Sequence, residues 1–149
     1  DKPEESTTET QGLIQKYPTI KAIVAPTSVG IVAAAKYVSG SASKGKVFVT
    51  GLGLPNDMKT YIKDGSGAQA SLWDVENFGY VSVYVANDIR NKKAKTTTGS
   101  TFKGGPTDKG LKSRTVIDQV NAAGKVTGNE IVLGPATVFT KDNVDQFNF

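Results

Sequence analysis

The chain has 149 residues, a net charge of +4, and neither cysteine nor histidine. Its length allows one domain with a real core, and its composition is that of a globular protein. The missing residue types exclude disulfides, thiolate metal sites and every catalytic site that needs an imidazole or a thiol. Catalysis could rest only on carboxylates, Lys or Tyr, and we expect no cofactor and no metal.

The first expected element is a helix. Ser6 and Glu9 have the spacing of a capping box, in which Ser6 begins the helix and Glu9 reaches back to its backbone. Leu13, Ile14 and Tyr17 would form a short apolar face. Pro18 then ends the helix, because the residue before a proline avoids the helical conformation.

Residues 20–38 have the pattern of a strand, a tight turn and a helix, and the rest of the chain is organised around them. The strand is rich in Ile and Val, as in strands that are covered on both faces, and Pro26 stops it. Ser28 is then placed to cap a helix. In an open parallel sheet such a turn lies at the carboxyl ends of the strands, where ligands bind. We therefore expect Pro26, Thr27 and Ser28 to contact a ligand.

A second strand and helix are expected over residues 47–65. Pro55 suits the first helical position, and Asp57 complements the helix dipole. The helix ends at Asp64 and Gly65. Its buried face would consist of Met58, Tyr61 and Ile62.

Two glycines, Gly51 and Gly53, lie between this strand and this helix. They are compatible with a phosphate-binding loop, but neither complete phosphate-binding motif is present. We interpret them instead as residues that let the backbone turn tightly at a cleft.

A third strand, over residues 68–72, leads to Trp73 and to Asp74, which can cap a long helix ending near Arg90. The lone Trp73 fits a core position and a ligand platform equally well. The helix would bury one apolar stripe, made of Phe78, Val81, Val85 and Ile89.

The remaining sequence is less regular. Residues 91–110 are rich in Lys, Thr and Gly and predict a long loop. Residues 90–114 are basic, but their single aromatic residue, Phe102, favours a solvated linker over a nucleic-acid surface. Short strands are expected over residues 115–120 and 131–133, and residues 138–139 precede a polar tail.

These elements predict an α/β fold with an open, mainly parallel sheet and helices on both faces. The carboxyl-terminal part is expected to be irregular, with short strands. No apolar run is long enough to span a membrane, and no signal segment is expected in this chain.

Three segments resemble extracytoplasmic sugar-binding proteins of ABC importers. They are the run from Ala22 to Gly30, the Leu72-Trp73-Asp74 sequence before an apolar helix, and the run from Lys141 to Asp145. The resemblance extends over essentially the whole chain. It is to the rhamnose-binding and autoinducer-2-binding branch of the ribose-binding-like family.

The resemblance implies one half of a two-lobed protein with a ligand cleft between the lobes. Residues 1–149 would form the carboxyl-terminal part, with residues 74–110 as a segment that crosses between lobes, and the amino-terminal lobe would be absent. It implies that Pro26, Thr27 and Ser28 face the ligand, that a turn with Gly53, Leu54 and Asn56 forms a cleft edge, and that Trp73 and Asp74 lie at an inter-lobe crossing.

The function that we expect is non-catalytic, extracytoplasmic binding of a sugar or autoinducer-2 for the membrane permease of an ABC importer. The apolar helix over residues 74–90 would be exposed without its other lobe, so self-association through it is also expected, or its folding back onto the sheet. Three alternatives stay open: the effector-sensing domain of a LacI-type regulator, a nucleotide- or flavin-binding enzyme core, and a purely structural interaction module.

Overall fold

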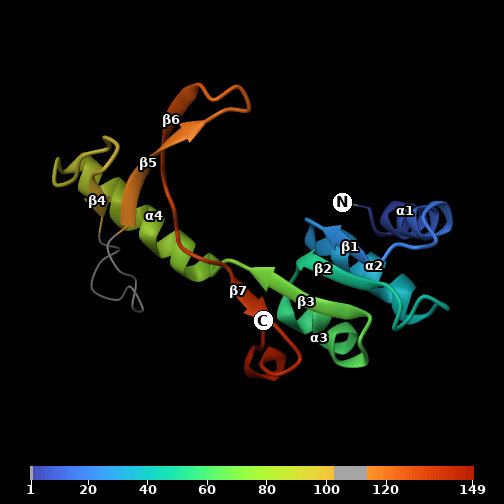
Figure 1. Ribbon diagram of the computed structural model, residues 1–149. Helices are drawn as coiled ribbons and strands as arrows, with labels where there is room; N and C mark the ends of the chain where they lie inside the picture. Colours follow the sequence, from blue (N-terminus) through green and yellow to red (C-terminus); the bar gives the residue numbers. More distant parts are fainter. Residues whose placement is uncertain (1, 103–113) are drawn as a thin grey trace. The chain divides into compact units, whose positions relative to one another are not determined.

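The computed structural model describes residues 2–102 and 114–149, which form two compact units (Figure 1). The first unit consists of Asp1–Leu72 together with Ala136–Phe149. The second unit is the intervening segment Trp73–Pro135.

A four-stranded sheet lies at the centre of the first unit. Its strands are β1 (Ala22–Ala25), β2 (Phe48–Leu52), β3 (Gly67–Leu72) and β7 (Thr137–Phe139), in the order β1-β2-β3-β7. β2 pairs in parallel with β1 and with β3, whereas β7 is antiparallel to β3. The predicted open, mainly parallel sheet is therefore confirmed.

Three helices accompany this sheet: α1 (Pro3–Lys16), α2 (Ser28–Ser39) and α3 (Pro55–Asp64). α2 and α3 contact each other and pack against β2 and β3, and α1 packs on α2. Between helices and sheet lies one continuous core. Its members with no exposed surface are Ile31, Ala35, Val38, Val49, Met58, Ala70, Phe139 and Val144.

The other face of the sheet is open among the described residues. Side chains alternate between the two faces of a strand, so Val24 points away from its buried neighbour Ile23. Val24 is 71% exposed, and Phe48 on the neighbouring strand is exposed as well. The expectation that β1 is covered on both faces is wrong for the described residues.

The first helix begins earlier than expected, and Ser6 does not cap it. α1 starts at Pro3, a residue suited to the first helical position, and Glu4 and Glu5 complement the dipole. Ser6 lies inside the helix, where its carbonyl accepts a hydrogen bond from Thr10. Of the predicted apolar face only Ile14 packs against the core, whereas Leu13 and Tyr17 are exposed.

The cap of α2 is also one residue away from its predicted position. Thr27 has an extended backbone, and its Oγ1 accepts a hydrogen bond from the N–H of Gly30 at 3.0 Å. Ser28 is the first helical residue. Both side chains can cap, so the choice depends on which residue has the non-helical dihedral angles.

The predictions for the next elements are confirmed. α3 begins at Pro55 and ends before Gly65, which adopts the left-handed conformation at φ 84°. Met58 and Ile62 are buried, and Tyr61 is partly buried against the same core. β3 covers the expected residues 68–72 and begins one residue earlier, at Gly67.

The second unit contains α4 (Val75–Arg90) and a three-stranded antiparallel sheet. The strands are β4 (Thr101–Phe102), β5 (Arg114–Val120) and β6 (Val126–Ile131). Asp74 caps α4 as predicted, because its Oδ1 accepts a hydrogen bond from the N–H of Asn77 at 2.9 Å. The predicted apolar stripe is only partly buried: Val81 is buried, but Phe78 and Ile89 are exposed.

The carboxyl-terminal strands differ in detail from the predictions. β5 covers the expected segment, but β6 lies earlier than the predicted strand over residues 131–133, because the turn at Gly124 is tight and pairing resumes at Val126. The expected loop over residues 91–110 contains β4, and residues 103–113 lie outside the described residues. The tail after β7 includes a short 3-10 helix, η1 (Val144–Gln146), in which Val144 is fully buried.

Candidate functional site

The carboxyl ends of the parallel strands form the candidate site edge. Ala25 at the end of β1 pairs with Gly51 of β2, and Leu52 at the end of β2 pairs with Ser71 of β3. The turns that follow β1 and β2 therefore leave the sheet at the same edge, as predicted. They carry residues 26–28 and residues 53–56.

The first turn, residues 26–28, carries the hydroxyl groups of Thr27 and Ser28, which differ in their hydrogen bonding. Thr27 Oγ1 uses one lone pair to cap α2, which leaves its O–H proton as a donor for another acceptor. Ser28 begins α2, where helix geometry leaves backbone N–H groups without intrahelical partners. Pro26 is exposed, and Thr27 and Ser28 are half-buried. This turn can therefore offer donors to a polar ligand.

Glycines allow the two strand ends to approach closely. A Cβ atom on Gly51, whose φ is 140°, would lie 1.9 Å from the carbonyl oxygen of Ala25. A Cβ on Gly53 would lie 2.9 Å from Cγ of Met58 and 3.0 Å from Cγ2 of Ile31. Gly53 is thus a packing requirement beneath the edge: it is buried, and its N–H donates to the carbonyl of Ser71 at 3.2 Å.

Of the other residues of the second turn, Pro55 is buried, Leu54 is half-buried and Asn56 is exposed. Leu54 precedes α3 with an extended backbone and packs against the core. Asn56 is exposed, and its N–H donates to the carbonyl of Phe149 at 3.2 Å. Its side-chain amide donates to Oδ1 of Asn148 at 3.4 Å. The carboxyl-terminal residues are therefore direct neighbours of this turn.

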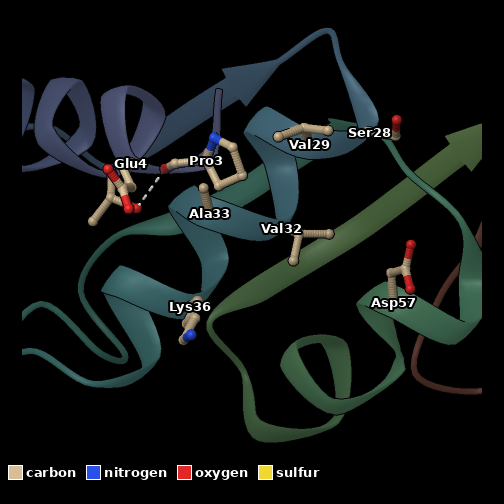
Figure 2. A pocket seen from close by; sticks show the side chains of 9 residues that line it. Pro3, Glu4, Ser28, Val29, Val32, Ala33, Lys36 and Asp57 are labelled. Atoms are coloured by element: carbon tan, nitrogen blue, oxygen red, sulfur yellow. Dashed lines mark hydrogen bonds between the residues drawn. The ribbon is translucent and has the colours of Figure 1, made fainter. Parts of the chain in front are cut away.

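Two hollows flank the first turn. One, of about 490 Å³, is bordered by the beginnings of α1 and α3 and by α2 from Ser28 to Lys36 (Figure 2). Ser28 and Val32 of α2 and Asp57 of α3 border it, and Asp57 was expected only as a dipole partner. The other, of about 350 Å³, lies between α1 and β1 and is lined by Pro26 and Thr27. The structure thus divides the three predicted residues between two surfaces.

Trp73 and Asp74 are the first residues of the second unit and follow directly after β3. Trp73 is 45% exposed, and the carboxylate of Asp74 is engaged in capping α4. Their chain position is the one predicted, immediately beyond the third parallel strand. A role in binding stays a prediction for both.

A charged cluster lies at the opposite edge of the first unit, where α2 and α3 end. Asp64 accepts hydrogen bonds from the hydroxyls of Ser39 and Ser66 at 2.5 and 2.6 Å and from Lys44 at 2.9 Å. Burial raises the pKa of Asp64, but these hydrogen bonds outweigh it and hold that pKa well below its usual range. This cluster stabilises the fold at the edge away from the candidate site.

Residues 2–102 and 114–149 contain no cluster of acidic side chains arranged to hold a metal ion. Over the same ranges, no helix combines the length and the apolar character needed to cross a membrane.

The comparisons with known proteins agree with the α/β fold described above. Residues 1–94 match the model of the family described as "Periplasmic binding protein domain". The solved structures that resemble the chain include a sugar ABC transporter protein from Actinomyces odontolyticus, with 39% identity and a TM-score of 0.75. This match covers 99% of the present chain and 43% of the other.

Two further structures match with similar coverage. One is an ABC transporter solute-binding protein from Clostridium phytofermentas with bound L-rhamnose, at 32% identity and a TM-score of 0.79, covering 97% of this chain and 45% of that one. The other is LsrB from Clostridium saccharobutylicum in complex with AI-2, at 22% identity and a TM-score of 0.77, covering 99% and 46%. The chain thus spans less than half the length of each. It belongs to the periplasmic binding protein domain family, a family of solute-binding proteins rather than enzymes.

Proposed function

We propose that the chain is part of an extracytoplasmic solute-binding protein that delivers a sugar to the permease of an ABC importer. A deoxyhexose of the L-rhamnose type is the first candidate ligand, since a relative with 32% identity holds L-rhamnose. Autoinducer-2 is the second candidate, from the sequence resemblance. In this proposal the protein binds the solute without changing it chemically.

The observation that carries this proposal is the shared edge at the ends of β1 and β2. A sugar has many hydroxyls and an apolar ring face, so its site needs aligned donors and acceptors beside an apolar surface. The O–H of Thr27, the hydroxyl of Ser28 and the first N–H groups of α2 supply donors. In this proposal Pro26, Leu54 and the ring of Trp73 supply apolar surface.

The chain carries only one wall of the site. The matched relatives are more than twice as long, and we assign the opposite wall to the part of such a protein that is not in this chain. Residues 74–110 then correspond to a segment that crosses between the two lobes. The two walls enclose the solute by hinge closure.

The test is an NMR titration of the isotopically labelled chain with L-rhamnose at millimolar concentrations. We expect shifts at residues 26–28 and 53–56 and at the indole of Trp73. Ser28→Ala should weaken the titration several-fold, because it removes a hydroxyl that does not cap α2.

The matched control is Ser43→Ala, at the opposite edge of the sheet, which should leave the titration unchanged. Shifts confined to the opposite edge would contradict the proposal. So would a Ser28→Ala variant that binds L-rhamnose as well as the unaltered chain.

A further inference from the structure

The segment after β7 is held tightly although its sequence is polar. Asn143 fixes its beginning, since its Oδ1 accepts the N–H of Thr140 at 2.7 Å and its Nδ2 donates to the carbonyl of Val138 at 2.9 Å. Val144 in η1 is fully buried in the core. Residues 143–149, which we call the terminal brace, thus have a defined conformation on the first unit.

Two kinds of contact attach the brace to its surroundings. Phe139 of β7 lies with its ring centroid 4.8 Å from that of Phe147 and 6.1 Å from that of Phe149, both in edge-to-face geometry. On α3, Lys63 contacts Asp145 at 2.6 Å, and Lys59 donates to the carbonyl of Phe147 at 3.2 Å. The brace therefore lies along α3 and reaches its first turn.

At that first turn the brace takes both hydrogen-bonding groups that Asn56 offers as donors. Asn56 is the second residue of α3, where the N–H has no partner within the helix. Such an N–H at a strand-end edge is a natural donor to a ligand. Here the carbonyl of Phe149 accepts it, and Asn148 accepts the side-chain amide.

We propose that the terminal brace positions the turn of residues 53–56 at the candidate site, and that Asn56 is a positioning residue rather than a ligand contact. The proposal rests on the proposed function for the meaning of this turn. According to this proposal, the brace fixes the start of α3. It thereby fixes the position of Leu54, the residue before α3, at the candidate site edge.

Amide hydrogen exchange tests the brace directly. Deleting residues 148–149 removes both acceptors of Asn56, and Asn148→Ala removes only the side-chain acceptor. We expect exchange of the Asn56 N–H to accelerate at least tenfold in the deletion and less in Asn148→Ala. The N–H groups of the buried residues Ile31 and Val49 donate to the carbonyls of Thr27 and Ser66, away from the brace, and should keep their exchange rates.

Gln15→Ala, which removes an exposed amide from α1, is the matched control and should change none of these rates. An unchanged Asn56 rate in the deletion would overturn the proposal. Equal acceleration at Ile31 and Val49 would also overturn it, because the brace would then be a general stabiliser without a local role.

Titration with L-rhamnose gives the second readout. In the deletion we expect the shifts at residues 53–56 to disappear and those at residues 26–28 to persist. If the unaltered chain shows no shifts with L-rhamnose, the proposed function fails, and the exchange rates still decide the role of the brace. If the shifts at 53–56 persist in the deletion, the brace does not position this turn.

Discussion

The two units differ sharply in how they bury their apolar side chains. In the first unit, Ile31, Val49 and Phe139 belong to one core and have no exposed surface. In the second unit, Val81, Phe102 and Val116 are buried, but Val83 of α4 is 68% exposed. Both units leave some apolar side chains in water, among them Val24 in the first, but among the described residues the large continuous core belongs to the first unit. The exposed apolar surface of α4 is one that another surface is expected to cover.

This difference matches the roles that we propose. The first unit, with the larger continuous core, carries the strand ends of the candidate site and holds them in place through α2 and α3. The second unit, with the smaller buried set, is the one that we assign to the crossing between lobes. The following substitutions test this contrast.

The largest expected effect comes from Phe139, which is fully buried and contacts the rings of Phe147 and Phe149. Phe139→Ala should lower the free energy of unfolding of the first unit by about 3–5 kcal/mol. Phe78→Ala removes the same group from a half-exposed position in the second unit and should cost far less. Urea unfolding of both variants checks this, and equal losses would contradict the contrast.

Asp64 should make the first unit sensitive to acid. Its pKa is lower in the folded chain than in the unfolded one, so it stabilises the fold above the unfolded pKa of about 4, and this stabilisation is lost as the pH falls below it. Asp64→Asn should cost about 2 kcal/mol at neutral pH, the scale of hydrogen bonds to a charged group.

The difference between Asp64→Asn and the unaltered chain should shrink as the pH falls below about 4. The exposed Asp142 provides the control, and Asp142→Asn should have no such effect. A difference that stays constant with pH would refute this account of Asp64.

Thr27 should have a smaller effect. Thr27→Ala removes the cap of α2 and should lower the free energy of unfolding by about 1 kcal/mol, whereas Thr27→Ser keeps the hydroxyl and most of that stability. Ser28→Ala should be nearly neutral in thermal unfolding. If Ser28→Ala were the more destabilising change, the assignment of the cap would be wrong.

Val83→Ser should change stability least, by less than about 0.5 kcal/mol, because the side chain is exposed. We expect the chain to self-associate through the exposed side of α4 that carries Val83. Val83→Ser should reduce this self-association, which light scattering measures. Tyr17→Ser removes an exposed ring from the first unit and should leave self-association unchanged. A chain that is monomeric at every concentration would contradict this role for α4.

Much of the first unit could be predicted from the sequence because its signals are local. Pro55, Gly65 and Asp74 mark helix ends through their own backbone or side-chain properties, and the structure confirms all three. The common edge of residues 26–28 and 53–56 followed from the alternation of strands and helices.

The errors come from features that depend on dihedral angles or on distant partners. Thr27 and Ser28 are equally good capping residues, and only the backbone conformation distinguishes them. The burial of Val144 and the contacts of Asn56 with the tail join residues that are far apart in the chain. No local pattern indicates them.

The central claim is that the chain carries one wall of a sugar site. With the opposite wall gone, about four hydrogen bonds to the sugar go to water, at about 0.5–1.5 kcal/mol each and more where the partner is a charged carboxylate. The loss of several kcal/mol moves a micromolar constant into the millimolar range. Isothermal titration of the chain with L-rhamnose tests this most directly. Our account predicts a dissociation constant in the millimolar range, and micromolar binding by a monomer would contradict it, because the site would then be complete.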